Sequence, residues 1–537
     1  MTPVPSAWPR EFNLCRYFLD QNLDAGRADK VALRCGDRQQ TYGELHARVR
    51  RLAAAFRSRG LRPEERVLIV LPDGFAFAET WFACLRAGGV FAMVNPLLKR
   101  SEFEYYLRYT KARIVVTAAD VLPEIEAAAR EAPLCESLFV VSSDGASVAE
   151  REAPCVDYEA AIAEQSGDDS LSLIESTGPD DLAGWLFTSG STGEPKACVH
   201  VQSDFAFSTE TYALDVVGYH EDDVCLSVPK LFFGYATGTN LMFPFRVGAT
   251  SILFPGRSTA DELFDQIERC SPTLLTGVPT LFGSMLRSPR IDSADFSSLR
   301  ACLSAGEALP AQIYKAWKAR TGVEILDGIG SAEMFHIYIS NRPGDVKVGS
   351  LGKVVPGYQV EIIGSEGESL KAGQLGRLRV HGASTALCYW ADKQKSNETF
   401  LGDCCTTADV FRVDEDGYYF YEGRDDDLLK VSGIWVSPLE IEDVLLRHEA
   451  VAEVCVVGRK DPDGLIKPYA YVVTGPDQQT GDDLAAELKA HVKHHLAPYK
   501  YPRWFEWRSE LPKNDRGKVA RKQLRDEASA TAAEGVS

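Results

Sequence analysis

A run of nine residues combines the side chains and the backbone freedom that suit a phosphate-binding loop. It reads Thr188-Ser189-Gly190-Ser191-Thr192-Gly193-Glu194-Pro195-Lys196. Glycines let successive backbone N–H groups turn toward one anion, and the four hydroxyl side chains add further donors. Lys196 ends the run with a positive charge on a flexible side chain. This composition predicts the binding of a polyphosphate.

The residues on either side of this run indicate the structure that would position it. Residues 184–187 (GWLF) and 197–201 (ACVHV) both read as buried strands, so the run is predicted to be a loop between two strands. The Walker A pattern G-x-x-x-x-G-K-[ST] is absent. A flexible serine- and glycine-rich linker is the alternative, and it is disfavoured by the proline, the lysine and the apolar flanks.

Five further blocks of glycine, hydroxyl and charged residues follow in the chain. They are residues 304–307 (SAGE), 327–333 (DGIGSAE), 407–409 (TAD), 423–427 (GRDDD) and 512–518 (PKNDRGK). With the phosphate loop, their order resembles that of the adenylate-forming superfamily of acyl- and aryl-CoA synthetases, luciferases and peptide-synthetase adenylation domains. The resemblance covers nearly the whole chain, and ordered blocks are far more specific than one glycine-rich loop.

This resemblance implies that the chain uses ATP, Mg²⁺ and coenzyme A. The loop would hold the β- and γ-phosphates, residues 327–329 would face the adenine, and residues 306–307 would lie near the base or the ribose. Asp409 would accept hydrogen bonds from the ribose hydroxyls, and Arg424 would be a second ribose contact. The implied nucleotide-binding residues are Thr188, Ser189, Gly190, Ser191, Thr192, Gly193, Gly306, Glu307, Asp327, Gly328, Ile329, Asp409 and Arg424.

Activation of a carboxylate by ATP brings two anions together and must release pyrophosphate. Fixed donors, lysines and Mg²⁺ cancel the charge that develops in the transition state. By resemblance, Glu333, which follows a glycine-rich turn after an apolar strand, is the Mg²⁺ ligand, and Lys196 acts beside the phosphates. Lys518 would bridge the substrate carboxylate and the α-phosphate. These three residues are the predicted catalytic residues.

The resemblance also implies two half-reactions served by a mobile C-terminal domain. Lys518 would serve adenylation, after which the small domain would rotate and admit CoA. Lys430 and Gly433 would then line the tunnel for the pantetheine arm. Asp426, the second residue after Arg424, would be the hinge.

One residue departs from the family's pattern, which usually has threonine before the magnesium-binding glutamate. This chain has Ala332 at that position. Losing a hydroxyl that meets a phosphate removes a hydrogen bond worth about 1.5–3 kcal/mol, which would slow adenylation. The departure leaves open a remote alternative, a non-catalytic protein that binds acyl-adenylate.

Residues 230–235 (KLFFGY) and 333–337 (EMFHI) most resemble the benzoate-CoA ligase branch. The branch commonly has alanine where this chain has Gly234. In the acid pocket that the resemblance implies, His336 would add a polar group at the edge. These features favour a benzoate with a small ortho group, with 2-aminobenzoate first and benzoate second. The acid pocket implied by position consists of Gly234, Tyr235, Ala305, Gly330, His336 and Ile337.

The predicted function is therefore that of an AMP-forming acid–thiol ligase, an aryl-CoA ligase acting on benzoate- or 2-aminobenzoate-type acids. An adenylating enzyme that loads an acyl group onto a carrier-protein thiol is the closest alternative. Product analysis with CoA and with a phosphopantetheinyl protein would separate the two.

Periodicity predicts the elements that would position these residues. Leu45, Val49, Leu52 and Phe56 recur at helical spacing, and short apolar strands alternate with helices up to residue 326. Such alternation implies a mostly parallel sheet with ligands beyond the carboxyl ends of its strands. Residues 349–421 are β-rich with glycine turns.

The predicted fold class is α/β, with a large N-terminal domain of doubly wound α/β subdomains plus a β-barrel-like subdomain, and a small mobile α+β C-terminal domain. A chain of 537 residues exceeds one ordinary core. The acidic turn at 425–427 marks the predicted boundary. Residues 1–425 would hold the ATP and aryl-acid sites, and residues 426–537 would carry the hinge and the catalytic lysine.

Composition limits the partners. With 45% hydrophobic and 25% charged residues the chain reads as globular, and a net charge of −19 disfavours a nucleic-acid surface. No apolar run reaches the length of a membrane span, and no secretory signal is predicted. Thirteen cysteines without a C-x-x-C pair predict reduced thiols in the cytoplasm. The oligomeric state stays open between monomer and homodimer.

Overall fold

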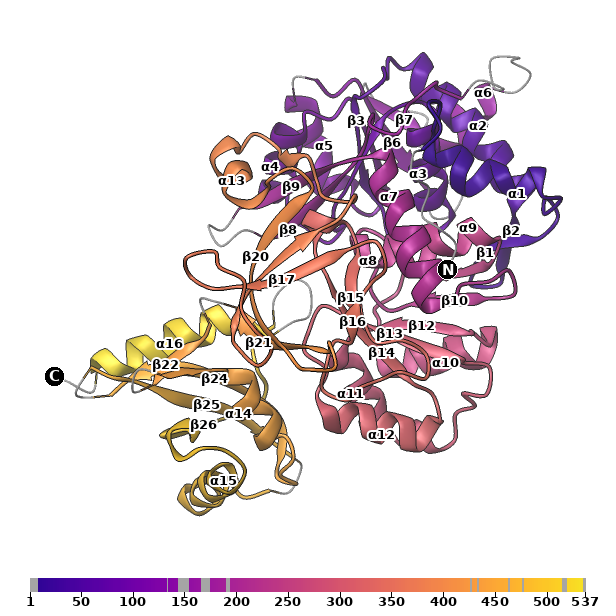
Figure 1. Cartoon of the computed structure of the whole chain (residues 1–537). Coiled ribbons are helices and arrows are strands. Elements are labelled where there is room, and N and C mark those ends of the chain that lie inside the picture. Colours follow the sequence, from indigo (N-terminus) through magenta and orange to yellow (C-terminus); the bar gives the residue numbers. More distant parts are fainter. Residues whose placement is uncertain are drawn as a thin grey trace.

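The computed structural model is a mixed α/β structure with a large N-terminal domain and a small C-terminal domain (Figure 1). This confirms the predicted fold class. In Figure 1 the C-terminal elements, orange to yellow, form a separate body at the lower left. The structure describes residues 8–132, 134–142, 154–165, 174–189, 194–424, 427–431, 434–461, 464–475, 478–513 and 519–534.

One sheet of the large domain has eight strands in the order β19-β9-β8-β4-β3-β5-β6-β7. The strands from β8 to β7 in this order pair in parallel, and β9 and β19 extend the sheet with antiparallel pairs. The bounds are β3 Arg66–Val70, β4 Val90–Met93, β5 Ile114–Ala118, β6 Ser137–Val141, β7 Cys155–Asp157, β8 Leu182–Ser189, β9 Pro195–Val201 and β19 Cys388–Tyr389.

A second sheet has nine strands in the order β16-β15-β14-β13-β12-β10-β11-β1-β2. The strands from β14 to β1 in this order pair in parallel, and β15, β16 and β2 are antiparallel additions at the two edges. The bounds are β1 Val31–Cys35, β2 Arg38–Thr41, β10 Val224–Ser227, β11 Thr250–Leu253, β12 Leu274–Gly277, β13 Ala301–Ser304, β14 Ile325–Gly330, β15 Ile337–Ser340 and β16 Lys353–Val354.

The helices of the large domain connect these strands and pack in groups, with α2 against α3 and α6, and α4 against α5. The α-helices are α1 Gln21–Asp24, α2 Tyr42–Ser58, α3 Phe75–Arg86, α4 Arg100–Thr110, α5 Leu122–Glu131, α6 Tyr158–Glu164, α7 Gln202–Ser208, α8 Gly234–Thr237, α9 Phe243–Val247, α10 Ala260–Cys270, α11 Pro279–Arg287, α12 Ala311–Thr321 and α13 Lys393–Thr399. Shorter turns are the π-helices η1 Arg16–Asp20, η3 Thr209–Val217 and η4 Gly238–Met242 and the 3₁₀ helices η5 Pro289–Asp292 and η6 Ala332–Met334.

Helix α2 shows how the sequence sets these elements. Thr41 and Glu44 form a capping box at its start, and the four residues predicted to share one face, Leu45, Val49, Leu52 and Phe56, are buried. The box satisfies two backbone N–H groups that would otherwise lack partners. Each of the four apolar side chains contributes roughly 1.5–3 kcal/mol on burial. The predicted helix is confirmed.

The β-rich region forms a four-stranded antiparallel sheet in the order β17-β18-β20-β21. Its strands are β17 Gln359–Ile363, β18 Gly376–His381, β20 Cys404–Val413 and β21 Tyr419–Arg424. In Figure 1 these strands lie between the two large sheets and the C-terminal domain.

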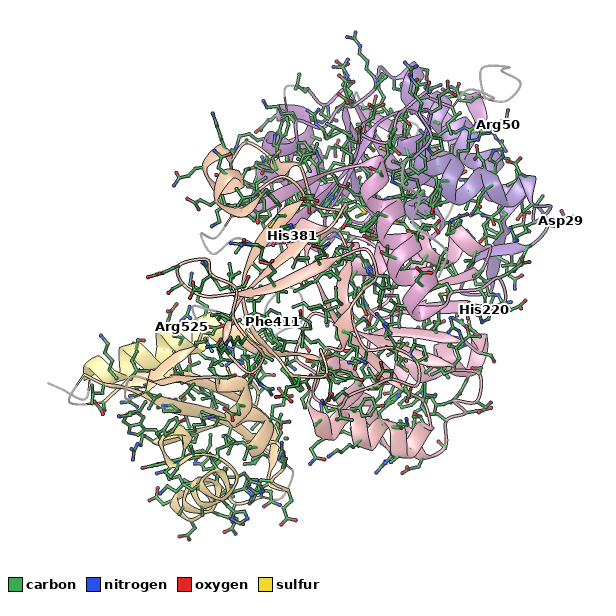
Figure 2. The ribbon with its side chains drawn as sticks, viewed as in Figure 1. Asp29, Arg50, His220, His381, Phe411 and Arg525 are labelled. Carbon is green, nitrogen blue, oxygen red and sulfur yellow. The ribbon has the colours of Figure 1, made fainter. Side chains whose placement is uncertain are left out.

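The C-terminal domain has two clusters of buried apolar side chains that consist only of its own residues. Arg525, labelled in Figure 2, donates from Nη1 to Oδ1 of Asp427 at 2.9 Å and so ties α16 to the start of the domain. The predicted boundary at 425/426 lies outside the described residues and stays a prediction. The elements are β22 Leu429–Val431, β23 Ile434–Val436, α14 Pro438–Leu445, β24 Val451–Lys460, β25 Ile466–Thr474, α15 Asp482–His495, η7 Pro498–Lys500, β26 Trp504–Arg508 and α16 Arg521–Glu534.

The structure can be compared with the predictions about disulfide bonds and membrane spans. The thirteen cysteines all lie among the described residues, and none of them forms a disulfide bond. Among the described residues, no helix is both long and apolar enough to span a membrane.

Candidate active site

The predicted phosphate loop joins the antiparallel strands β8 and β9. Thr188 lies opposite Lys196, and Ser189 lies opposite Pro195. The two strands predicted to flank the loop are confirmed. Gly190, Ser191, Thr192 and Gly193 lie outside the described residues, and only the backbone of Ser189 is described.

Lys196 lies at the start of β9 with its ammonium group paired. Its Nζ is 2.8 Å from Oδ2 of Asp392, and this contact lowers the pKa of the Asp392 carboxyl. The preceding residue is held as well, because the Tyr105 hydroxyl donates to the carbonyl oxygen of Pro195 at 2.6 Å. The strand that carries Lys196 is therefore anchored to α4.

Glu333 lies in η6, the turn that follows β14. Its Oε1 accepts a hydrogen bond from the Tyr389 hydroxyl at 2.6 Å, and its carbonyl oxygen accepts from the Ala386 N–H at 2.8 Å. Burial, together with the nearby Glu333 carboxylate, raises the pKa of Tyr389. The phenol therefore keeps its proton and acts as a donor to Glu333.

Tyr389 brings two of the predicted catalytic residues to one place. The Lys196 ammonium lies 5.8 Å from the centre of its ring, while Glu333 binds its hydroxyl. No sequence pattern indicated that Tyr389 lies beside these two residues. The tyrosine is placed by the pairing of β19 with β9, in which it lies opposite Cys198. These two strands are far apart in the chain, and no local pattern indicates that they pair.

The segment predicted to face adenine differs from the expected glycine-rich turn. Asp327, Gly328, Ile329 and Gly330 complete β14, and the last three of them pair with β15. The glycines allow this close pairing, since a Cβ at Gly328 would lie 2.7 Å from the Ile339 carbonyl oxygen. The prediction of a turn was therefore wrong, because glycine here serves close strand approach rather than reversal of the chain.

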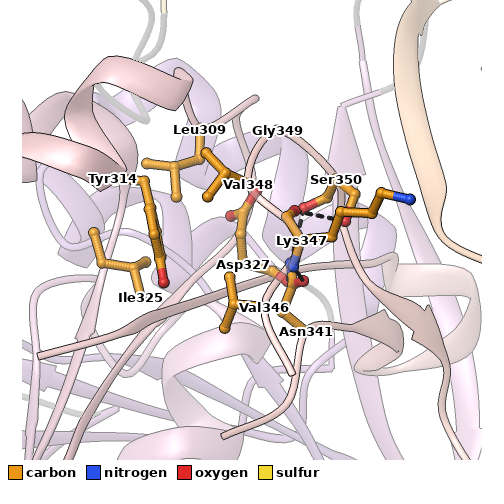
Figure 3. Close-up of a pocket in the computed structure, with 10 residues that line it drawn as sticks. All are labelled: Leu309, Tyr314, Ile325, Asp327, Asn341, Val346, Lys347, Val348, Gly349 and Ser350. Carbon is orange, nitrogen blue, oxygen red and sulfur yellow. Dashed lines mark hydrogen bonds between the residues drawn. The ribbon is translucent and has the colours of Figure 1, made fainter. Parts of the chain in front are cut away.

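A pocket lies beside the buried carboxyl of Asp327 (Figure 3). The Asn341 side chain donates to the carbonyl oxygens of Asp327 at 3.1 Å and Ser350 at 2.8 Å. Burial raises the pKa of Asp327 to about 8, and the charge of Glu307 adds to this effect. Glu307, which follows Gly306, accepts a hydrogen bond from the Thr280 hydroxyl at 2.7 Å. The two segments predicted near the base therefore lie together. The pocket is lined by Leu309, Tyr314, Ile325, Asp327, Asn341, Val346, Lys347, Val348, Gly349 and Ser350.

The predicted ribose contacts lie on neighbouring strands. Asp409 of β20 is directly opposite Arg424 of β21. Cross-strand partners lie close together, so the register brings the two positions to one side of the small sheet. Only the backbone of Arg424 is described.

Several residues predicted for the acid pocket lie near His336. Gly330 and Ile337 are cross-strand neighbours, Ala305 follows β13, and Gly234 and Tyr235 begin α8. The ring centre of His336 lies 5.4 Å from those of Tyr212 and Tyr235 and 4.6 Å from that of Phe243. The structure thus brings together residues from three parts of the chain.

The hydrogen-bonding state of His336 follows from its partners. Its Nε2 lies 3.2 Å from the Tyr235 carbonyl oxygen, which only accepts, so this nitrogen carries the hydrogen. Burial lowers the pKa of His336 to about 3, and the ring is neutral. Its Nδ1 is therefore a buried acceptor, and it has no hydrogen-bond partner among the described residues. The Tyr235 hydroxyl is also buried and has no hydrogen-bond partner among the described residues.

Gly234 does not border open space. A Cβ at this position would lie 3.3 Å from both methyl carbons of Leu186. Glycine in place of the branch's alanine was expected to open space beside the substrate ring. Leu186 partly fills that space, and an alanine at 234 would press on the Leu186 side chain.

The remaining predicted residues belong to the small domain. Lys518, Asp426 and Gly433 lie outside the described residues. Lys430 lies in β22, with only its backbone described. Their predicted functions stay predictions.

Comparison with known proteins gives consistent matches along the chain. The profile of the family described as AMP-binding enzyme matches residues 19–390, and that of the AMP-binding enzyme C-terminal domain matches residues 440–518. A benzoate–CoA ligase of Thauera aromatica is 42% identical over 98% of both chains. A 4-hydroxybenzoate–CoA/benzoate–CoA ligase of Rhodopseudomonas palustris is 39% identical over 96% of this chain and 94% of its own.

Two solved structures are also similar. An anthranilate CoA ligase in complex with anthranoyl-AMP superposes with a TM-score of 0.91 at 36% identity, covering 98% of this chain and 99% of that one. A benzoate CoA ligase from Burkholderia xenovorans LB400 superposes with a TM-score of 0.86 at 39% identity, covering 96% of this chain and all of that one.

Proposed function

This chain belongs to the AMP-binding enzyme family, and we propose that it is an ATP-dependent aryl-CoA ligase. It adenylates an aromatic carboxylate of the benzoate or 2-aminobenzoate type and transfers the acyl group to CoA, releasing AMP and pyrophosphate. The observation that carries this proposal is the convergence of Lys196 and Glu333 on Tyr389 at the phosphate-loop hairpin. Aromatic side chains also surround His336, a residue of the predicted acid pocket.

Adenylation requires positive charge and donors where the triphosphate lies. Lys196 supplies a cation at the end of the phosphate loop, and its partner Asp392 keeps it in place before nucleotide binds. Arrival of a phosphate would offer Lys196 a stronger partner than a half-exposed carboxylate. The lysine then stabilises charge that develops on the leaving pyrophosphate.

The donor set fits a magnesium ion. The Tyr389 hydroxyl donates a hydrogen bond to Oε1 of Glu333, and the second carboxylate oxygen, Oε2, could bind a cation. No group of three His, Cys, Asp or Glu side chains among the described residues could hold a metal ion. One carboxylate suits Mg²⁺, which usually binds substrate phosphates and keeps several waters. When bound, the ion would neutralise phosphate charge, and Glu333 would hold it.

The buried polar atoms of the acid pocket favour a substrate that carries a hydrogen-bond donor. His336 Nδ1 is a buried acceptor that lacks a partner among the described residues. An amino or hydroxyl group on the substrate ring would satisfy it, whereas an unsubstituted ring would leave it unpaired. Leaving a buried polar group unpaired costs about 1–3 kcal/mol. A 2-aminobenzoate is therefore the preferred substrate, and benzoate is a slower one.

The small domain serves both half-reactions in turn. Lys518 acts in adenylation, Asp426 is the hinge, and Lys430 and Gly433 border the path of the pantetheine arm. The acceptor is CoA, with a carrier-protein thiol as the alternative. Thirteen cysteines without a disulfide bond support a reducing compartment, and the cytoplasm is the proposed location.

A substrate panel tests the proposal. With ATP and CoA, kcat/KM is measured for benzoate, 2-aminobenzoate, 2-hydroxybenzoate, 4-hydroxybenzoate and hexanoate. We expect 2-aminobenzoate to lead, with benzoate about 10-fold or more behind. Hexanoate in first place would overturn the aryl assignment, and 4-hydroxybenzoate in first place would overturn the ortho preference alone. Replacing CoA by a phosphopantetheinyl protein tests the acceptor.

A further inference from the structure

A buried acid–histidine pair connects the phosphate-loop strand to the turn that carries Glu333. His200, near the end of β9, has its Nδ1 2.8 Å from Oδ2 of Asp204 and its Nε2 2.7 Å from the carbonyl oxygen of Ala332. The side chains of His200 and Asp204 are 0% and 3% exposed. Burying two such polar groups is costly unless their atoms are paired, and here they are.

The partners determine which way the bond to Ala332 points. A carbonyl oxygen only accepts, so Nε2 of His200 carries a hydrogen and donates it. One more proton lies between Nδ1 and Asp204, whose Oδ2 also accepts from the Val201 N–H at 3.2 Å. Burial raises the pKa of Asp204. Whichever of the two atoms holds that proton, Nε2 still donates to Ala332.

The bond acts on the peptide group directly before Glu333. The Ala332 carbonyl belongs to the peptide that ends at the Glu333 nitrogen, while Tyr389 and Ala386 hold the side chain and the carbonyl of Glu333. His200 and Lys196 are four residues apart on β9 and point to the same face of that strand. One strand therefore carries the phosphate-loop lysine and the anchor of the glutamate turn.

We propose that His200, oriented by Asp204, is a positioning residue for Glu333 that fixes the glutamate relative to Lys196 during adenylation. This rests on the proposed function, in which Glu333 and Lys196 act on the triphosphate. The pair holds the backbone of residue 332, so its action does not depend on the side chain there. Alanine at this position, in place of the usual threonine, leaves the anchor intact.

Two variants of His200 distinguish the hydrogen bond to the Ala332 carbonyl oxygen from the packing of the His200 side chain. In His200→Gln, the amide nitrogen reaches about as far as Nε2 and can still donate to Ala332. In His200→Asn, the shorter side chain can pair with Asp204 but cannot reach the carbonyl. We expect His200→Asn to lower kcat for adenylation, measured by ATP–pyrophosphate exchange, by about 10- to 100-fold, the usual cost of losing a group that orients a metal ligand.

The expected signature is a split between steps. In His200→Asn, thioester formation from preformed aryl-adenylate and CoA, and KM for the aromatic acid, should stay within about twofold of the parent enzyme, because neither uses Glu333. His200→Gln should recover most of the adenylation rate. Asp204→Asn, which keeps the imidazole in place, should give the same split with a smaller loss and serves if His200→Asn does not fold.

Binding supplies a second readout that needs no turnover. ATP affinity is measured by calorimetry with and without Mg²⁺. In His200→Asn, the gain in affinity on adding Mg²⁺ should fall by about tenfold, while affinity without the ion stays unchanged. If the parent enzyme forms no aryl-adenylate, the proposed function fails, and the Mg²⁺-dependent gain still tests the positioning of Glu333.

Tyr42→Phe is the matched control. It removes a buried side-chain bond of the same kind, from the Tyr42 hydroxyl at the start of α2 to the carbonyl oxygen of Ala249, the residue before β11, at 2.6 Å. This variant should lose stability without separating the two half-reactions. Equal losses in both half-reactions of His200→Asn, an unchanged Mg²⁺ gain, or the same split in Tyr42→Phe would overturn the proposal.

Discussion

At the scale of single residues, burial decides the charge that Asp327 carries. Its carboxyl lies beside the pocket of Figure 3, and burial raises its pKa to about 8. Hydrogen bonds from the backbone N–H groups of Leu309 and Gly328 lower the pKa by less than burial raises it. At neutral pH the carboxyl is therefore mostly protonated and can both donate and accept a hydrogen bond.

This shift predicts how Asp327→Asn changes stability with pH. Between the unfolded pKa of about 3.9 and the folded value near 8, the native state keeps a proton that the unfolded chain has lost. Rising pH in this window therefore lowers the free energy of unfolding, by about 1.4 kcal/mol per pH unit, and asparagine lacks this loss. Urea unfolding should show the variant gaining about 2–3 kcal/mol on the parent between about pH 5.5 and 7.5. A pH-independent difference would contradict the raised pKa.

Gly234 offers a test of the ring substituent. An alanine methyl would lie 3.3 Å from the Leu186 methyl groups, which would have to move toward neighbouring space. A bulkier substrate suffers more from such crowding, and one small group is worth about 1–3 kcal/mol. Gly234→Ala should therefore lower kcat/KM for 2-aminobenzoate about 10-fold more than for benzoate, with KM for ATP unchanged. An unchanged ratio of the two acids would place the ortho group elsewhere.

The predicted catalytic residues stand in local motifs, whereas the contacts that folding creates around them could not be predicted from the sequence. Lys196 and Glu333 stand in short blocks that can be read directly. Tyr389 and His200 act through contacts with residues far away in the chain. A tyrosine or a histidine in an apolar strand has no sequence signal that separates a partner in a site from core packing.

At the scale of elements, the β14–β15 pair shows why glycine patterns are ambiguous. A glycine can reverse the chain or let two strands approach closely, and the sequence predicted the first at residues 327–330. The structure has the second, with Gly330 paired to Ile337. A Cβ at Gly330 would lie 2.3 Å from the His336 carbonyl oxygen.

Gly330→Ala should therefore damage both stability and the acid pocket. The added methyl forces β15 away from β14, and overpacking of this kind costs roughly 1–3 kcal/mol. Because His336 and Ile337 move with β15, KM for the aromatic acid should rise more than KM for ATP. Gly256→Ala is the control, since an added methyl group there would have no neighbouring atom within 4 Å. Thermal unfolding and the two KM values decide, and equal behaviour of both variants would refute the close-approach argument.

At the scale of the whole molecule, periodicity was sufficient for the helices and the parallel strands but not for the edges of the sheets. The face of α2 was predicted residue by residue and is buried. The addition of β19 to β9 was not predicted, because it joins residues near 198 to residues near 388. Yet this added strand brings Tyr389 to Glu333 in the candidate site.

The C-terminal domain has its own core. Its buried apolar clusters consist of its own residues, and Arg525 ties its last helix to Asp427 at its start. A described link to the large domain is the bond from the Ser437 hydroxyl to the Glu422 carbonyl oxygen at 2.6 Å. Rotation about a point just before Asp427 would therefore preserve the interior of the domain while exchanging what it presents to the adenylate.

The hinge assignment predicts opposite effects for two variants of the small domain. Asp426→Pro fixes φ near −65° and removes one backbone donor, which restricts rotation at the predicted pivot. If adenylation needs only the first orientation, ATP–pyrophosphate exchange should stay within about twofold, while thioester formation falls by about 100-fold or more.

Lys518→Ala should instead lower ATP–pyrophosphate exchange and spare thioester formation, because the charge of Lys518 serves only the first step. Single-turnover assays starting from acid and ATP, and separately from preformed aryl-adenylate and CoA, measure both effects. Normal thioester formation in Asp426→Pro would move the pivot to another residue, and parallel losses in Lys518→Ala would end the division of labour between the two orientations.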